Sequence, residues 1–245
     1  MKITKWNRLK PVSSPVPATV VIGVFDAFHR GHQTLAAAAF AESGDAVRVA
    51  VTFRVMPPGK GKPVYPFRMR LADLEAAGFD EAVVIDFNAR FAALSADRFF
   101  RKLAAAYRIE RLTVGADFRC GSGRSASVAD LERMLPQTAV QAVMLTGGAE
   151  HKVSASDIRR FLESGKPEAA AEVLVRPYRL PMRLTGKKRG IRRRCGLTVL
   201  ADGVYNALID GKKTTVKVKG AFIRLNREIL VKKPIEIIIL SKYKE

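Results

Sequence analysis

The chain has 245 residues, 48% of them hydrophobic, which is enough for a substantial packed core and excludes a disordered protein. Lysine and arginine number 43 against 23 aspartate and glutamate, and this formal net charge of +20 suggests an anionic partner. The charge is uneven, because residues 1–175 carry 24 basic and 18 acidic side chains whereas residues 176–245 carry 19 and 5.

Apolar runs alternate with helical patterns through the first 175 residues. Strands are expected over residues 18–24, 47–53, 82–87, 112–114 and 139–145, and helices over residues 31–42, 68–77, 96–107, 128–135, 155–164 and 167–174. Strands that alternate with helices predict βαβ units. The predicted fold is therefore α/β and Rossmann-like, with an open, mostly parallel sheet and helices on both faces.

The pattern changes near Arg176, where short alternating segments separated by glycine turns begin. Strands are expected over residues 180–184, 197–200, 204–209, 214–218, 221–225 and 235–240. Asp202-Gly203 and Asp210-Gly211 are hairpin signals. These features predict a small all-β, barrel-like domain over residues 176–245 that follows a larger domain over residues 1–175.

The number of cysteines and the hydropathy pattern indicate in which cellular compartment the protein is expected. Cys120 and Cys195 are the only cysteines, so neither a disulfide framework nor a metal-ligand spacing is present. Residues 1–10 lack the apolar core of a signal peptide, and the apolar run 235–240 is far too short to cross a bilayer. We expect a soluble cytoplasmic protein without a membrane partner.

The strongest motif, residues 23–32, follows the first predicted strand and opens the first helix. In an open parallel sheet this is the usual ligand position, where backbone N–H groups and the helix dipole favour anions. Two of the chain's three histidines, His29 and His32, lie here, and each imidazole can donate a hydrogen bond to a phosphate oxygen. The alternatives are histidines in a solvent-exposed turn and metal ligation, for which no third ligand is nearby.

Residues 23–26 (GVFD) and 29–32 (HRGH) resemble the signature of HxGH-type nucleotidylyltransferases, and more narrowly the adenylyltransferase module of bacterial FAD synthetases. Three further segments support the narrower resemblance: residues 85–99, residues 114–119 (VGADFR) and residues 153–159 (VSASDIR). The four segments occur in family order within about residues 15–175.

The resemblance implies that ATP transfers its adenylyl group to FMN to give FAD and pyrophosphate, with Mg²⁺ expected alongside ATP. It implies a catalytic role for four residues: His29, His32, Ser156 and Arg159. The residues expected at ATP are Gly23, Val24, Phe25, Asp26, His29, His32, Gly115, Asp117, Lys152, Ser154, Ser156 and Arg159. Those expected at FMN are Phe53, Arg54, Asp117 and Phe118.

The chemistry of these residues agrees with adenylyl transfer, in which positioning and charge neutralisation dominate. Arg159 lies one turn into a helix opened by Ser154, so hydroxyls, helix N–H groups and an arginine fork could together hold phosphate. The alternative is that Ser154 or Ser156 is only an N-cap and Arg159 only a surface charge. Asp117 could bind nucleotide hydroxyls or a Mg²⁺-linked water, or serve only as a turn residue.

Several positions depart from the family pattern. Ala27 stands where glycine is usual, and residues 54–57 replace the proline and histidine of the family's flap after the second strand. The loop over residues 54–66 is rich in proline, glycine and lysine, and we interpret it as a flavin-side lid. Lys60 and Lys62 could meet the FMN phosphate, although exposed loop lysines are usually only solvated.

The last 70 residues resemble the start of a riboflavin kinase barrel. The kinase's P-T-A-N residues are absent from the segment where they should fall, residues 196–200, so we expect a degenerate, shortened barrel without kinase activity. The run over residues 187–194 has six basic residues among eight, and it is either a solvated hairpin or a site of weak, non-specific polyanion binding.

Two rival functions stay open on the sequence. One is nucleotidyl transfer to another phosphorylated acceptor, which would use the same phosphate-binding residues. The other is a non-catalytic nucleic-acid-binding protein that uses the basic C-terminal domain.

Overall fold

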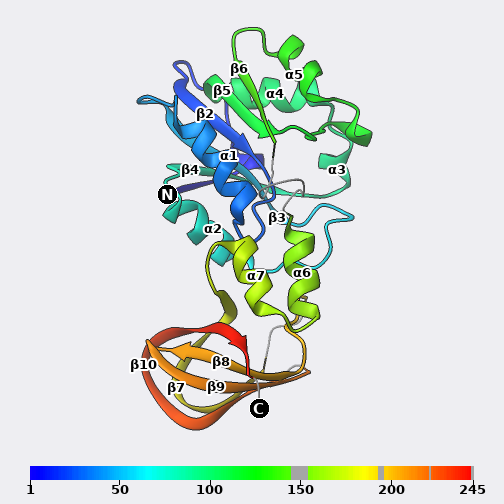
Figure 1. Cartoon of the computed structure of the whole chain (residues 1–245). Helices are drawn as coiled ribbons and strands as arrows, with labels where there is room; N and C mark the ends of the chain where they lie inside the picture. Colours follow the sequence, from blue (N-terminus) through cyan, green and yellow to red (C-terminus); the bar gives the residue numbers. More distant parts are fainter. Residues whose placement is uncertain (145–153, 193–195, 221, 244–245) are drawn as a thin grey trace. The chain divides into compact units, whose positions relative to one another are not determined.

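The computed structural model describes residues 1–144, 154–192, 196–220 and 222–243, with only the backbone described for much of strands β7 and β10 (Figure 1). The chain forms two compact units. The first contains Met1–Gly59 and Arg70–Lys152, and the second contains Lys60–Met69 and Val153–Glu245. The domain border after residue 175 stays a prediction from the sequence.

The first unit is built on a six-stranded sheet in the order β1-β4-β3-β2-β5-β6, and every pairing in it is parallel. Its strands are β1 (Lys2–Lys5), β2 (Val16–Ile22), β3 (Val47–Val55), β4 (Glu81–Asp86), β5 (Tyr107–Gly115) and β6 (Ala139–Val143). The predicted parallel sheet is confirmed. Strand β1 was not predicted, and it pairs with β4 from Lys2 opposite Glu81 to Lys5 opposite Val84.

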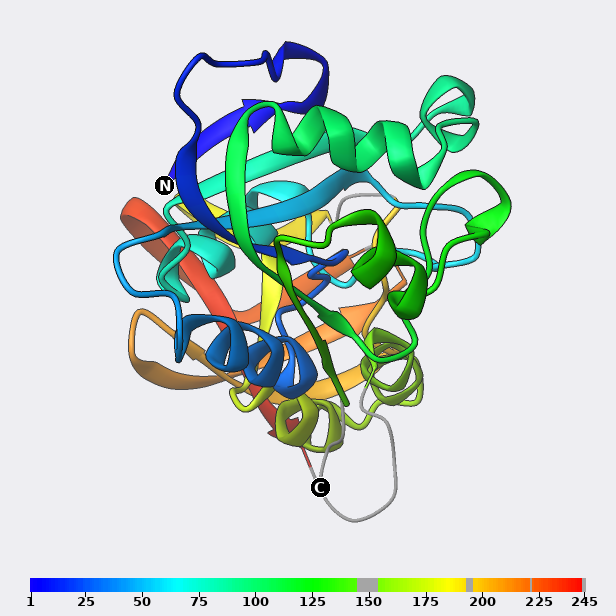
Figure 2. The ribbon, with the colours of Figure 1, turned by 90° about the horizontal axis from the view of Figure 1, so that it is seen from above.

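The α-helices that alternate with these strands are α1 (Arg30–Phe40), α2 (Phe67–Ala76), α3 (Ala89–Ala92), α4 (Ala96–Ala104) and α5 (Val128–Met134). Short 3₁₀ turns cover Trp6–Arg8 and Ser122–Arg124. Successive residues of β2 face opposite sides of the sheet, so Val20 packs in one buried cluster and Val21 in another. Helices α4 and α1 lie on these opposite sides, which confirms the prediction of helices on both faces (Figure 2).

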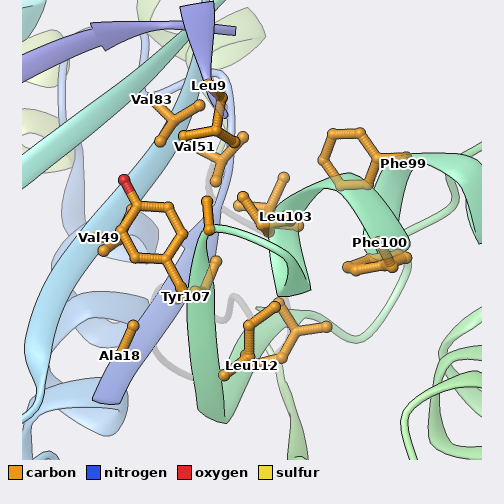
Figure 3. Packing of buried hydrophobic residues seen from close by; sticks show 14 of the residues in the cluster. Leu9, Ala18, Val49, Val51, Val83, Phe99, Phe100, Leu103, Tyr107 and Leu112 are labelled. Carbon is orange, nitrogen blue, oxygen red and sulfur yellow. The ribbon is translucent and has the colours of Figure 1, made fainter. Parts of the chain in front are cut away.

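Helix α4 illustrates why this core forms. Its buried residues Ala96, Phe99, Phe100 and Leu103 follow the spacing of one helical face, and the Ser95 side chain caps the helix by accepting from the Arg98 N–H. The same cluster contains Val49, Val51 and Leu112 from the sheet, as Figure 3 shows.

Strand order places a topological switch point between β2 and β5. From β2 the chain proceeds outward through β3 and β4, and it then returns to the other side of β2 to add β5 and β6. Strands β2 and β5 pair in parallel, with Val21 opposite Thr113, so their carboxyl ends lie side by side. Ligands of open α/β sheets bind at such points.

The second unit holds helices α6 (Ala155–Glu163) and α7 (Pro167–Leu174) and strands β7 (Tyr178–Arg192), β8 (Gly203–Ile209), β9 (Lys212–Lys219) and β10 (Phe222–Lys242). The long β10 pairs with β7 along most of its length, with β9 near its start and with β8 near its end, and β8 pairs with β9. These antiparallel pairings run around a ring, so the predicted barrel-like β-domain is confirmed.

Three sequence predictions in this unit need correction. Residues 197–200 form no strand. The expected strands 221–225 and 235–240 both fall in the single strand β10, which begins at Phe222, and residue 221 lies outside the described chain. The basic run does not form a separate hairpin in its described part. Residues 187–192 lie within β7, and their backbone pairs with β10, with Arg192 opposite Phe222. Residues 193–195 lie outside the described chain.

Candidate active site

The motif loop begins where β2 ends, at the switch point of the first unit. The Gly23 N–H donates to the Val51 carbonyl at 3.1 Å, which ties the loop to β3. A Cβ at Gly23 would lie 3.0 Å from the ring of Phe25, so glycine lets this ring pack against the backbone. Helix α1 then begins at Arg30, and its N-terminus and dipole follow directly on the loop.

Three non-glycine residues of this loop have left-handed backbone conformations: Phe25 (φ 52°), Ala27 (φ 66°) and Phe28 (φ 40°). Such conformations are strained for residues with a Cβ, and they persist only where the surrounding packing enforces them. Here Phe25 and Phe28 are buried in the same cluster as Leu35 of α1. The positive φ at Ala27 also explains why glycine is expected in the motif there.

The two histidines of the motif are in direct contact. The ring centroids of His29 and His32 are 3.8 Å apart, and the Phe25 ring lies edge-on to His32 at 5.2 Å. His29 is buried at 3% exposure, whereas His32 as a whole residue is half-buried. The His32 Nδ1 is shut off from solvent and has no hydrogen-bond partner among the described residues.

The pKa of His32 lies well below its ordinary value. Burial is the largest cause, followed by the neighbouring His29 and then by the charge of Arg70. His32 is therefore neutral at physiological pH, with one nitrogen that donates and one that accepts. A neutral imidazole can still donate an N–H to a phosphate oxygen, and it can take up a proton when negative charge comes close.

Arg70 of α2 binds the backbone of the motif loop, and it was not predicted from the sequence. It is buried at 2% exposure, and its Nη2 donates to the carbonyls of Val24 at 2.7 Å and Phe53 at 2.6 Å. Burial lowers the pKa of Arg70, and the nearby charge of Asp26 opposes this effect. The available signal is spacing, because Arg70 is four residues before the buried Leu74 and so falls on the inward face of the predicted helix.

Residues 115–118 follow β5 and therefore lie at the strand end beside the motif. Gly115 is buried and its carbonyl accepts from the Phe118 N–H at 2.8 Å, which closes a tight turn. Phe118 is half-buried against the core, and the Asp117 side chain is exposed. The structure thus brings the predicted Gly115 and Asp117 to the same switch point as Gly23 and Asp26.

The residues predicted at FMN on β3 have partners within the protein. The Phe53 ring lies edge-on to Phe91, with centroids 6.1 Å apart. Arg54 is exposed and forms a two-pronged ion pair with Asp86, at 2.5 and 2.8 Å. Hydrogen bonding to Arg54 lowers the pKa of Asp86, so the carboxylate stays ionised and occupies the arginine fork.

Ser154, Ser156 and Arg159 lie in the second unit, around the start of α6. The Ser154 hydroxyl donates to the Asp157 carboxylate at 2.9 Å, and the Ser154 N–H donates to it at 3.1 Å, so Ser154 acts as an N-cap. Arg159 Nη2 donates to the Ser156 hydroxyl at 2.9 Å. Lys152, also predicted at ATP, lies outside the described residues.

Within the described part of the chain, no group of three or more histidine, cysteine, aspartate or glutamate residues could hold a metal ion. No described helix is long and apolar enough to cross a membrane.

Comparison with known proteins agrees with this geometry. The sequence model of the family described as FAD synthetase matches residues 12–157. A protein of Geobacillus thermodenitrificans, provisionally named a bifunctional riboflavin kinase/FMN adenylyltransferase, is 33% identical over 71% of this chain and 97% of its own length. The bifunctional riboflavin kinase/FMN adenylyltransferase of Mycoplasma pneumoniae is 32% identical over 65% of this chain but only 55% of its own length.

A solved structure shows the same fold. The crystal structure of a macrolide-efflux protein from Streptococcus pneumoniae superposes with a TM-score of 0.78 over 100% of this chain and 92% of that one. At 20% identity, this likeness bears on the fold alone. The family match spans more than half of the chain and includes the whole motif loop, so this chain belongs to the FAD synthetase family and is homologous to bifunctional riboflavin kinase/FMN adenylyltransferases.

Proposed function

We propose that the protein transfers the adenylyl group of ATP to FMN, with FAD and pyrophosphate as products. The observation that carries this proposal is the stacked pair of His29 and His32 on a buried loop at the start of α1, in a chain of the FAD synthetase family. The switch-point position, the helix N-terminus and two imidazole donors together favour a polyphosphate ligand.

In the proposed reaction an FMN phosphate oxygen attacks the α-phosphorus of ATP, and the bond from this phosphorus to the bridging oxygen of pyrophosphate breaks. His29 and His32 donate hydrogen bonds to the triphosphate and stabilise the charge that moves toward the leaving pyrophosphate. Helix α1 adds its N-terminal dipole. Positioning of the two substrates supplies most of the remaining rate enhancement.

Further contacts are proposed on the family resemblance. Ser156 and Arg159 supply a second set of phosphate donors, in which the arginine fork suits phosphate oxygens. Phe53 and Phe118 offer aromatic surface for the flavin, while Asp117 is an exposed carboxylate beside the motif. Mg²⁺ enters with ATP as part of the substrate, since it is held largely by phosphate oxygens with one or two carboxylates.

We also propose that this protein does not phosphorylate riboflavin, although its relatives are named as bifunctional. The support is the sequence of residues 196–200 (GLTVL), which does not contain the consecutive P-T-A-N residues of the kinase segment.

The test is to incubate the purified protein with FMN, ATP and Mg²⁺ and to separate the products by chromatography. FAD is expected from FMN, and none from riboflavin. His29→Ala and His32→Ala should each slow FAD formation by roughly 10²-fold, the scale of losing one transition-state donor. Thr34→Ala, at an exposed position two residues after His32 on α1, is the control and should keep the wild-type rate. Absence of FAD with the wild-type protein would refute the proposal.

A further inference from the structure

The loop that leaves β3 is fastened to the C-terminal part of the chain. Thr198 makes two hydrogen bonds to it: its hydroxyl donates to the Lys62 carbonyl at 3.0 Å, and its N–H donates to the Pro63 carbonyl at 2.8 Å. Thr198 is buried at 4% exposure, so water competes weakly for these bonds. The segment that the sequence suggested as a lid is therefore fixed at Lys62 and Pro63.

A second attachment lies three residues further along the loop. Tyr65 is wholly buried, and its ring is parallel to that of Tyr178 within 6°, with centroids 5.8 Å apart. The Tyr65 hydroxyl accepts from the Arg179 N–H at 3.2 Å. Both Tyr178 and Arg179 belong to β7, so the β-domain holds this loop at two separate points.

The fixed loop also contacts Arg159. Arg159 Nη1 lies 3.5 Å from the same Lys62 carbonyl that accepts from Thr198. The Arg159 side chain crosses Gly61 so closely that a Cβ there would lie 3.2 Å from its Nε. At 3.5 Å a hydrogen bond is at its long limit, so a small shift of the Lys62 carbonyl would break it.

We propose that Thr198 is a positioning residue for Arg159, and that it acts by holding the Lys62 carbonyl in place. The β-domain would then hold Arg159 in place, although the segment that contains Thr198 lacks the kinase residues. The inference rests on the proposed role of Arg159 at the ATP phosphates.

The first test replaces Thr198 with valine, which keeps the side-chain shape and the bond from the Thr198 N–H but removes the hydroxyl donor. We expect kcat for FAD formation to fall about 5- to 10-fold, the effect of one lost hydrogen bond. The KM for FMN should stay within about twofold, and Thr198→Ser should restore most of the rate. An unchanged kcat in Thr198→Val would overturn the inference.

A double-mutant cycle separates positioning from a general loss of structure. If Thr198 acts through Arg159, the Thr198→Val substitution should have little further effect in an Arg159→Ala background under single-turnover conditions. A full additional loss in the double variant would show that Thr198 acts independently of Arg159.

A glycine pair provides a second route should Thr198→Val fold poorly. Gly61 and Gly59 both have positive φ, +69° and +79°, so replacing either with alanine introduces similar backbone strain. The Cβ of Gly61→Ala meets Arg159, whereas that of Gly59→Ala has no atom of the described residues within 4 Å. We expect kcat for FAD formation to fall about 5-fold or more in Gly61→Ala and about twofold or less in Gly59→Ala. Equal losses would refute the inference.

The wild-type assay distinguishes a failure of the proposed function from a failure of the inference about Thr198. If the wild-type protein makes no FAD, the proposed function fails and the inference fails with it. If it makes FAD, and Thr198→Val and Gly61→Ala do so equally well, only the positioning role of Thr198 is refuted.

Discussion

The imidazole rings of His29 and His32 stack with centroids 3.8 Å apart and planes 25° apart. Two protonated imidazoles at this separation would repel each other strongly, and the buried cation of Arg70 adds to this repulsion. Burial and these two neighbours lower the pKa of His32, so the free protein holds it neutral. The site can therefore receive a polyanion and a proton together.

The first prediction follows from this lowered pKa. Above about pH 6.5, the ordinary pKa of histidine, His32 is neutral in both the folded and the unfolded chain and contributes no pH dependence. Below it, the unfolded chain takes up a proton that the folded protein does not, so stability falls. We expect the urea midpoint of unfolding to be lower at pH 5.5 than at pH 7.5.

His32→Gln, which cannot titrate, should show a smaller drop between these two pH values. Carboxylates such as Asp130, whose pKa is lowered to about 2 by its bonds to Ser127, titrate well below this window. If the variant and the wild-type protein have the same pH dependence, His32 is not the group responsible.

The second prediction concerns Arg70. Arg70→Met removes the donor to the carbonyls of Val24 and Phe53 and leaves Asp26 without its buried neighbouring cation. We expect the free energy of unfolding to fall by about 3–5 kcal/mol, the scale of removing one partner of a buried ionic group. Arg70→Lys should lower the free energy of unfolding by less, because lysine keeps the positive charge but not the forked guanidinium group.

Arg68→Met is the control for Arg70, because Arg68 is exposed on the same helix. It should change the free energy of unfolding by less than about 0.5 kcal/mol. Chemical denaturation measures the free energy of unfolding of Arg70→Met, Arg70→Lys and Arg68→Met. Equal stability of Arg70→Met and Arg68→Met would show that Arg70 does not hold the motif loop.

The third prediction uses the strained backbone of Ala27. Ala27→Gly removes a wholly buried methyl, which costs about 0.8 kcal/mol, but it relieves a left-handed conformation that costs alanine roughly 1–2 kcal/mol. We expect the net stability to be unchanged or slightly higher. Ala39→Gly removes an equally buried methyl from α1 and should destabilise by about 2 kcal/mol, since helix propensity adds to the loss. A similar loss in both variants would contradict the strain at Ala27.

The parallel sheet and the motif at its switch point could be predicted because their signals are local. Buried parallel strands are continuous runs of apolar residues, and the motif loop joins one such run to a helix. Strand β1 could not be predicted in this way, because it is a four-residue edge strand whose Ile3 is exposed. Its partners are distant in sequence: the Glu81 carboxylate accepts hydrogen bonds from both Lys2 and Thr4.

Long-range contacts also explain why Arg70 and the single strand β10 were not predicted from the sequence. The partners of Arg70 are backbone carbonyls at Val24 and Phe53, and no local pattern marks a carbonyl as an acceptor. Strand β10 was expected as two strands, over residues 221–225 and 235–240. The structure joins them in one strand, whose pairing with β7 shifts register between Arg224 and Ile229 and again between Val231 and Ile235.

The fourth prediction concerns Gly121, which follows the family-like segment after β5. Its φ is +78°, and a Cβ there would lie 2.8 Å from the backbone nitrogen of Ala96, the first residue of α4. Gly121→Ala must therefore displace the start of a helix that packs in the main core. Gly123→Ala introduces a similar strain, because φ is +62° there, but within the described part of the chain no atom lies within 4 Å of its Cβ.

We expect Gly123→Ala to cost about 1–2 kcal/mol, the strain of a left-handed alanine. Gly121→Ala should cost about 1–3 kcal/mol more, the range for inserting a methyl where the surroundings cannot yield. Urea denaturation of both variants measures this difference directly. If the two lose the same stability, Ala96 moves aside freely, and the glycine at residue 121 is needed only for its backbone conformation.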